Sequence, residues 1–498
     1  MVKVETLIPA ALALMALGLW LRRLPSRGGH VRGVDAWFYL LYAGALRRQR
    51  RLPAQLQHFV LDIKEQWYPP LFPALLALLP ETWRVRAKEW VSPIVDVLQL
   101  LLLLLTAAFF VAEPTAVLLA GLIYAVTPTL VYEHSTLNSR ALASLIFTLV
   151  MLSLWGLLSQ GGWHWIVVGG FAGALLLLTH KMATQLLAFF VLALSLIERR
   201  GDILGVGVLA VIGAFALSGG FYLKVLRGHL EILRFWRRHF SNLNAHQVYD
   251  SPLYQGPRPL AAPVRRFYEG GIAWIWRMVG LLLAHNPWAI LFPVLLWSQP
   301  GDQFGAFLIL WTGLGYIAVI LTTFAPSLRL LGEGFKYIKF VVFPLAILTG
   351  RVLGAWPEIL LTLPFLGLCG AAIWKFQKGR ALEIIDTDFL HVVDFLKTDP
   401  RDRIASIPCH ACDPLAYLTG KRVLWGAHSA GYEKLEPWFP VIRRPITDVL
   451  DAHGVPLLLV DRQYVNPNAL CLDGHFRPVL ERGRFLLLER KRAGEKTG

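Results

Sequence analysis

Long uncharged apolar runs recur along the chain, separated by short polar turns and by three long polar segments. Most runs approach the ~20 residues that a helix needs to cross a bilayer core. The pattern predicts about eleven spanning helices, the tenth ending near Gly350 and the others at about residues 6–21, 93–112, 115–131, 141–158, 164–179, 182–197, 203–223, 280–298, 304–324 and 357–374.

The three polar segments cover residues 22–92, 224–279 and 375–498. Each of them follows an odd number of predicted spans, so all three lie on the same side of the membrane. In the first, Val34 to about Arg51 predicts an amphipathic helix lying in the interface with its apolar side down. The apolar piece Ala74–Leu79 is too short to cross a bilayer, so we expect an interfacial or re-entrant segment.

From residue 375 the charge rises and the apolar runs shorten, which predicts a soluble α/β domain of about 120 residues. A helix is expected around His391–Leu396. Strands are expected at Arg403–Ile407, Arg422–Trp425, Val455–Val460 and Arg484–Leu488. The expected organisation is therefore a membrane domain, 1–374, with long loops at 22–92 and 224–279, and a soluble domain, 375–498.

Composition supports an α-helical polytopic membrane protein. Of the 498 residues, 55% are hydrophobic and only 16% are charged, against about 25% charged in a soluble domain. The net charge of +16 suits anionic lipids or an anionic substrate. Nucleic acid is not expected as a partner, because no binding-motif signature is present.

The cysteines do not form a recognisable metal site. Cys409 and Cys412 have a CxxC spacing, but no second pair completes a zinc site, and no metal is expected from them. Free thiols, a local disulfide and one bond to Cys471 all remain open, and a structural role is favoured. Cys369 lies in an apolar helix and is expected to be inert.

Asp35 is the sharpest candidate for chemistry. It opens an aromatic segment beside a span, with Trp37, Phe38 and Tyr39, so partial desolvation would raise its pKa toward the range of a general base. The alternative is a capping or interfacial carboxylate paired with a nearby arginine. Asp96, early in the second span, is interpreted as a buried polar contact.

Other ionisable groups gather at helix ends. Glu133 and Arg140 bracket a short loop, and such groups near a shared cavity are functional-site hypotheses; a solvated Glu133 and a snorkelling Arg140 are the alternative. His180-Lys181 separates two apolar runs without a glycine or proline turn. The pair could bind a phosphate by charge and hydrogen bonds, and a plain polar turn is the alternative.

Lys336 and Lys339 share a helix face, with Tyr337 between them. Two cations at a helix N-terminus oppose the helix dipole, which indicates an anion nearby; snorkelling toward lipid headgroups is the alternative. Glu65, Trp67 and Tyr68, with the prolines that follow, are interpreted mainly as a rigid wall.

These segments resemble the GT-C superfamily of membrane glycosyltransferases, which use polyprenyl-phosphate sugars and include protein O-mannosyltransferase and aminoarabinose-transferase-like groups. The resemblance lies in Asp35 with its aromatic helix, in YPPLFPALLAL at 68–78 and in TLNSRALA at 136–143. It continues in GEGFKYIKFVVFPLAILTG at 332–350 and in HVVDFLKTDPRDRIASIP at 391–408, followed by YLTGKRV at 417–423. The absence of WWDYG argues against an oligosaccharyltransferase, and the single Asp35 loosens the tie to protein O-mannosyltransferases.

The resemblance implies a GT-C fold and transfer of a sugar from a polyprenyl-phosphate donor to an extracytoplasmic lipid, glycan or protein of the cell envelope, with inversion and Asp35 as general base. The donor phosphate would be held by Arg140, His180, Lys181, Lys336 and Lys339. The substrates would also contact Tyr39, Glu65, Tyr68, Glu133 and Tyr337. No cofactor is expected, although a divalent cation stays open, and the partners are the donor, membrane lipids and an unknown acceptor.

The positive-inside rule and the family resemblance predict opposite orientations of the chain in the membrane. The basic polar segments, counted by the positive-inside rule, would lie in the cytoplasm. The resemblance places these loops and the C-terminal domain outside the cytoplasm, in a protein of the cell (inner) membrane, and we adopt that orientation. A transporter or flippase for lipid-linked sugars, and a non-catalytic GT-C-like subunit, remain alternative functions.

Overall fold

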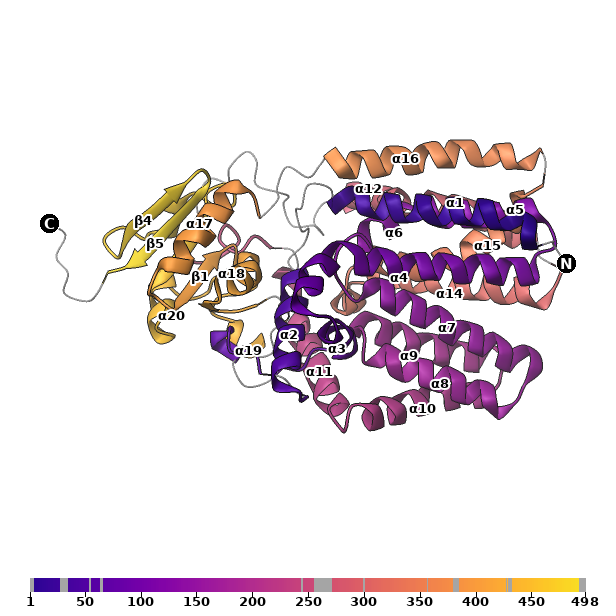
Figure 1. Cartoon of the computed structure of the whole chain (residues 1–498), viewed down its shortest axis with the longest axis horizontal. Helices are drawn as coiled ribbons and strands as arrows, with labels where there is room; N and C mark the ends of the chain where they lie inside the picture. The colour runs from indigo at the N-terminus through magenta and orange to yellow at the C-terminus, as the bar shows by residue number, and fades with distance from the viewer. Residues whose placement is uncertain are drawn as a thin grey trace.

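A bundle of long helices and a small α/β domain lie end to end in the computed structural model of the chain (Figure 1). The N-terminus lies at the far end of the bundle from the C-terminal domain (Figure 1). The structure describes residues 4–26, 35–52, 55–62, 66–242, 245–254, 271–298, 301–355, 357–378, 385–426, 428 and 432–491.

The bundle contains helices that are long and apolar enough to cross a membrane. Within the described residues, four such helices occur, and two bent pairs bring the number to six. The protein is therefore an integral membrane protein, while the full count of eleven spans stays a prediction. The long bundle helices are α1 (Val4–Arg23), α4 (Glu81–Phe110), α5 (Pro114–Val126), α7 (Arg140–Gln160), α8 (Trp163–Leu177), α9 (Lys181–Ile197), α10 (Asp202–Leu217), α12 (Gly271–His285), α14 (Gln303–Phe324), α15 (Val342–Leu353) and α16 (Leu363–Lys378).

Other helices connect and cap these elements. The remaining α-helices of the membrane domain are α2 (Asp35–Gln49), α3 (Leu71–Leu78), α6 (Pro128–Glu133), α11 (Tyr222–Arg238) and α13 (Phe292–Trp297). The 3₁₀ helices of this part are η1 (Leu24–Ser26), η2 (Val60–Asp62), η3 (Phe240–Asn242), η4 (Pro287–Leu291), η5 (Pro326–Leu331), η6 (Gly334–Phe340) and η7 (Glu358–Thr362). The short α3 agrees with the expectation of a segment that does not span.

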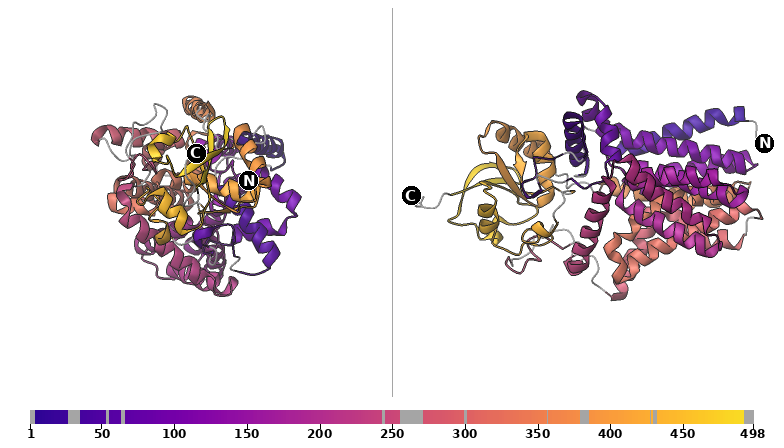
Figure 2. Two further views of the ribbon diagram at one scale, coloured as in Figure 1. Left: turned by 90° about the vertical axis from the view of Figure 1, so that its left-hand side faces the viewer. Right: turned by 90° about the horizontal axis from the view of Figure 1, so that it is seen from below.

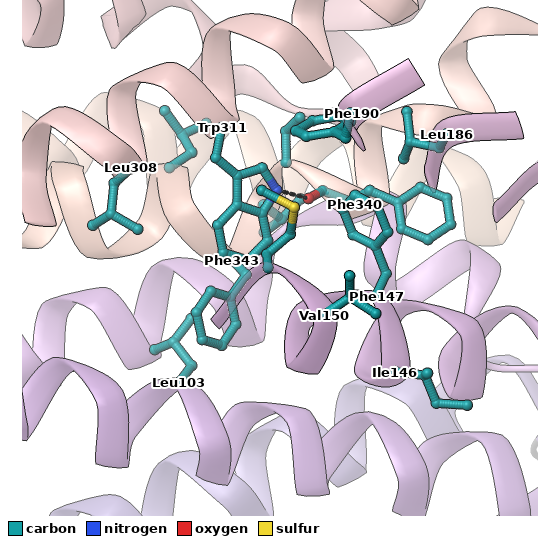
Figure 3. Close-up of a cluster of buried hydrophobic side chains, with 14 of the residues drawn as sticks. Leu103, Ile146, Phe147, Val150, Leu186, Phe190, Leu308, Trp311, Phe340 and Phe343 are labelled. Atoms are coloured by element: carbon teal, nitrogen blue, oxygen red, sulfur yellow. Dashed lines mark hydrogen bonds between the residues drawn. The ribbon is translucent and has the colours of Figure 1, made fainter. Parts of the chain in front are cut away.

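An aromatic core fixes η6, the segment that carries both predicted lysines. Trp311 on α14 donates a 3.1 Å hydrogen bond from Nε1 to the carbonyl of Phe340, and Phe147 packs 5.2 Å from the Phe340 ring (Figure 3). At the other end of η6, a Cβ on Gly334 would lie 2.0 Å from Oγ1 of Thr323. Only glycine lets η6 approach α14 this closely.

A buried polar cluster joins the helices at the end of the bundle nearest the C-terminal domain. Arg22 donates from Nε to Asp96, 2.5 Å away, and Asp96 also contacts Tyr124 Oη at 2.8 Å and His134 Nδ1 at 2.6 Å. Each of these side chains is almost completely excluded from solvent. The buried polar contact expected for Asp96 is therefore present, and it ties α1, α4 and α5 to the loop after α6.

The helix α2 corrects one prediction. Residues Ala36–Leu46 are all buried, so the helix does not lie with one side in the membrane interface. Instead the bundle covers one side and the C-terminal domain covers the other, where Trp37 packs 5.2 Å from the ring of Tyr417. The sequence pattern near α2 showed apolar residues but not the domain that contacts them.

Two spans are broken by sharp bends. The axis turns by 115° between α10 and α11, so α11 runs across the end of the bundle (Figure 2). It buries Val225, Ile232 and Phe235 against the protein and exposes leucines such as Leu223 on another face. The axis turns by 105° between α12 and the pair η4 and α13, at the interruption that the Asn286-Pro287 sequence predicts.

The C-terminal domain is a five-stranded sheet with the order β2-β1-β3-β5-β4. β1 pairs in parallel with β2 and β3, and β5 pairs antiparallel with β3 and β4. Its elements are β1 (Arg403–Ile407), β2 (Arg422–Val423), β3 (Leu457–Asp461), β4 (Phe476–Arg482), β5 (Phe485–Arg490), α17 (Thr387–Thr398), α18 (Cys412–Thr419), α19 (Tyr432–Leu435), α20 (Ile446–Ala452), η8 (Cys409–Ala411) and η9 (Pro467–Leu470). Four strands match the predicted segments, while β4, with Pro478 at a bulge, was missed.

Breaking the buried ion pair of Asp96 is expected to destabilise the bundle. Asp96→Asn leaves the guanidinium of Arg22 buried without its counter-charge, which should lower the free energy of unfolding by about 3–5 kcal/mol. Thermal unfolding in detergent micelles measures the change. Glu89→Gln, which breaks the half-exposed pair of Glu89 with Arg23, is the control and should change stability by less than about 1 kcal/mol. Equal effects of the two variants would contradict the prediction.

Candidate functional site

Asp35 is the first residue of α2 and faces two partners. Its Oδ2 accepts a hydrogen bond from Nη2 of Arg140 at 3.0 Å, and its Oδ1 lies 3.2 Å from Nε2 of His428. Burial alone would raise the pKa of this carboxyl, but the charges of His428, Arg140 and Lys336 outweigh it and hold the pKa well below its usual range. Asp35 is therefore an ionised carboxylate at neutral pH, which corrects the expectation of a raised pKa.

The guanidinium of Arg140 bridges two carboxylates. Its Nη1 lies 3.1 Å from Oε2 of Glu133, and the same oxygen lies 3.4 Å from Nζ of Lys339, which is fully buried. Asn138 sets this geometry, since its amide donates to the Glu133 carbonyl and its Oδ1 accepts from the Arg140 backbone N–H. The loop between α6 and α7 thus holds the carboxylate of Glu133 and the guanidinium of Arg140 in a fixed geometry.

The phenol groups of Tyr39 on α2 and of Tyr68 in the first long loop lie beside Asp35. The hydroxyls of Tyr39 and Tyr68 are 2.7 Å apart, and Tyr39 also contacts Oγ of Ser139 at 3.0 Å. Burial raises the pKa of Tyr68 to about 12, so it stays a neutral hydrogen-bonding group. Glu65, which the sequence placed in the same wall, lies outside the described residues.

A cavity of about 530 Å³ lies between the bundle and the C-terminal domain. Its charged lining comes entirely from the membrane domain: Lys181, Arg329, Glu333 and Lys336. Lys336 forms a 2.6 Å ion pair with Glu333. The side chain of Lys181 makes no hydrogen bond or ion pair with any residue that the structure describes. A cation without a partner in a protein cavity marks a place for an anionic ligand.

The C-terminal domain lines the same cavity with uncharged groups. Most of them follow the carboxyl ends of β1 and β3, where the strand order reverses direction and where α/β sheets bind ligands, while Phe439 and Pro440 follow α19. Burial lowers the pKa of His410 there to about 4, so this imidazole is neutral at physiological pH. The domain residues that line the cavity are Pro408, Cys409, His410, Phe439, Pro440 and Tyr464.

Two predicted residues lie behind the cavity wall. The hydroxyl of Tyr337 donates to Oε1 of Gln185 at 2.6 Å, and Nε2 of Gln185 lies 2.9 Å from Nε2 of His229. Both partners line the cavity, while Tyr337 does not. His180 is buried at the start of α9, and its Nδ1 has no hydrogen-bond partner among the described residues.

The structure therefore brings Asp35, Glu133, Arg140 and Lys339 into one ionic network, with Lys181 and Lys336 on the adjacent cavity. The main residue that sequence reasoning missed is His428. The sequence did contain one signal for it: His428 follows a predicted strand, and the carboxyl ends of parallel strands in α/β sheets often carry functional groups. Among the described residues, no group of three or more His, Cys, Asp or Glu side chains is arranged to hold a metal ion.

Comparisons with known proteins show the fold. No protein-family model and no curated protein sequence matches the chain. The solved structure of ArnT from Cupriavidus metallidurans bound to undecaprenyl phosphate is 15% identical, with a TM-score of 0.58 over 98% of this chain and 97% of that one. The Archaeoglobus fulgidus oligosaccharyltransferase AglB, in complex with an inhibitory peptide and a dolichol-phosphate, is 11% identical, with a TM-score of 0.57 over 94% of this chain and 71% of that one. The GT-C fold expected from the sequence is thereby confirmed.

The cysteine thiols are predicted to differ in reactivity. All four are free, and only Cys471 is exposed. Burial raises the pKa of Cys409 above its usual range and that of Cys412 to about 11, which disfavours the reactive thiolate. A maleimide at pH 7 should label one thiol in the native protein and four in denaturant, as counted by intact-mass spectrometry. Rapid native labelling of Cys409 or Cys412 would contradict the burial described.

Proposed function

We propose that this chain, which has the GT-C fold, is a membrane glycosyltransferase that moves a sugar from a polyprenyl-phosphate donor to an acceptor. One observation carries the proposal: Lys181 faces a cavity without a partner, next to the ionic network of Asp35. The two structures of similar fold were solved with undecaprenyl phosphate and dolichol-phosphate, which supports a lipid phosphate as the missing anion.

The charges around the site leave an excess of positive charge for an anionic ligand. Five cations meet three carboxylates, which leaves two positive charges, enough to balance a lipid that is linked to its sugar through one phosphate or two. The cations are Arg140, Lys181, Arg329, Lys336 and Lys339, and the carboxylates are Asp35, Glu133 and Glu333.

The proposed reaction is a single displacement with inversion. The acceptor oxygen or nitrogen attacks the anomeric carbon while the bond from that carbon to the phosphate oxygen breaks and its electron pair passes to the phosphate. Asp35 takes the proton of the acceptor. Lys181 and Lys336 stabilise the charge that grows on the leaving phosphate, and one such group is worth about 3–4 kcal/mol in the transition state.

The proposed orientation is the one that the GT-C resemblance implies. The site lies where the C-terminal domain meets the bundle, so donor lipid and acceptor meet at that membrane surface (Figure 2). We place this surface, the long loops and the C-terminal domain outside the cytoplasm, in the cell (inner) membrane. The uncharged lining on the domain side suits an acceptor whose reacting end carries no charge, because burying an unpaired charge is costly.

Removing the carboxylate charge of Asp35 is expected to abolish transfer. Asp35→Asn should reduce kcat at least about 10²-fold, since an amide cannot take a proton. Transfer of label from a polyprenyl-phosphate-linked sugar in membranes measures the rate. Asp302→Asn, which alters a carboxylate–arginine pair at the opposite end of the bundle, is the control and should leave the rate unchanged. Near-normal turnover by Asp35→Asn would exclude the proposed base.

Removing the unpartnered cation is expected to weaken donor binding. Lys181→Gln should lower the affinity for undecaprenyl phosphate about 10- to 100-fold, the range for loss of a hydrogen bond to a charged group. Native mass spectrometry in detergent measures the bound fraction. Lys397→Gln alters an exposed lysine of the C-terminal domain and should bind normally. Unchanged binding by Lys181→Gln would place the phosphate elsewhere.

A further inference from the structure

The carboxylate at the centre of the site receives a side chain from the other domain. His428 belongs to the C-terminal domain and lies 393 residues from Asp35 in the sequence, yet its Nε2 is 3.2 Å from Oδ1 of that residue. The side chain is 16% exposed, so the contact is largely shielded from water. Neither the GT-C resemblance nor the local sequence assigned His428 a role.

Backbone pairing brings His428 to this position. A piece of the first long loop joins the edge of the domain sheet: Phe59 bridges Val423 in parallel, and the Val423 N–H donates to the carbonyl of His58 at 2.7 Å. The Leu61 N–H donates to the carbonyl of Leu424 at 3.2 Å. The chain that ends β2 is therefore fixed against the membrane domain four residues before His428.

A glycine completes this attachment. A Cβ on Gly426 would lie 2.3 Å from the ring of Phe59 and 2.5 Å from Oδ1 of Asp413. Only a residue without a side chain can pass between them. Because Phe59 also stacks on Phe38 of α2, at 6.4 Å between ring centroids, the same contacts fix the start of the loop relative to the helix of Asp35.

Aromatic rings hold the imidazole itself. The His428 ring lies 4.7 Å from the ring of Tyr68, 5.0 Å from Phe38 and 6.0 Å from Tyr39. These rings restrict the imidazole to one orientation, with Nε2 directed at Asp35. Such an enclosure positions a hydrogen bond at low entropic cost, because few alternative rotamers remain.

We propose that His428 is a positioning residue of the transfer reaction, supplied by the C-terminal domain, whose hydrogen bond orients Asp35. The inference rests on the proposed function. With Arg140 on Oδ2 and His428 on Oδ1, the carboxylate cannot rotate, and its remaining lone pairs stay directed at the acceptor.

Two substitutions separate the hydrogen bond from the ring packing. His428→Gln keeps an N–H donor, so kcat should stay within about threefold of the wild-type value. His428→Phe keeps the ring packing and removes the donor, so kcat should fall about 10-fold or more, with unchanged affinity for undecaprenyl phosphate. The control is His391→Gln, at an exposed position on α17, which should keep the wild-type kcat.

A thermal measurement tests the contact without activity. Asp35→Asn, His428→Phe and the double variant form a cycle, and a direct contact predicts Tm changes that do not add. Additive Tm changes, or a kcat of His428→Phe equal to the wild-type value, would overturn the inference. Absence of transfer in the wild-type protein would instead contradict the proposed function, while the Tm cycle would still decide whether His428 contacts Asp35.

Discussion

The bridge that Arg140 makes between Asp35 and Glu133 is the interaction on which the site depends. Two carboxylates brought together at the edge of a bilayer would repel each other and take up protons. A single guanidinium in contact with both keeps them ionised and sets the distance between α2 and the loop after α6. The planar fork of arginine suits this role, since lysine offers a point charge rather than two separated donors.

The location of the site follows from the media on either side of it. The lipid phosphate that we propose as ligand would stay at the bilayer surface, which suits the positions of Lys181 at the start of α9 and Lys336 in η6. The C-terminal domain then covers these groups from the aqueous side. Removing water in this way strengthens each charge interaction within the site, because the local dielectric constant falls. The buried helix α2 contacts both the bundle and the C-terminal domain, so it connects the membrane part of the site to the aqueous part.

The sequence predicted the elements well and their assembly only in part. Apolar runs and alternation located the membrane helices and four of five strands, because burial in lipid or in a sheet imposes those periods directly. Strand β4 was missed because an edge strand with Pro478 and exposed charges lacks that alternation. For the site, helix-end position singled out Asp35, Arg140 and Lys181. His428 was missed because its position after a predicted strand does not indicate which residue it meets, and its contact with Asp35 depends on pairing between β2 and a loop more than 300 residues away.

The two lysines of η6 have different electrostatic roles. Lys339 pairs with Glu133 in the protein interior, while Lys336 pairs with Glu333 in its own turn at the cavity surface. Glu333 is therefore a resident counter-ion of Lys336. If the proposed phosphate donor binds here, it would displace only one carboxylate from Lys336, and its departure would restore that pair. Loading and release of the anion would then be an ion exchange, in which the empty site carries less uncompensated positive charge than its cations alone would give it.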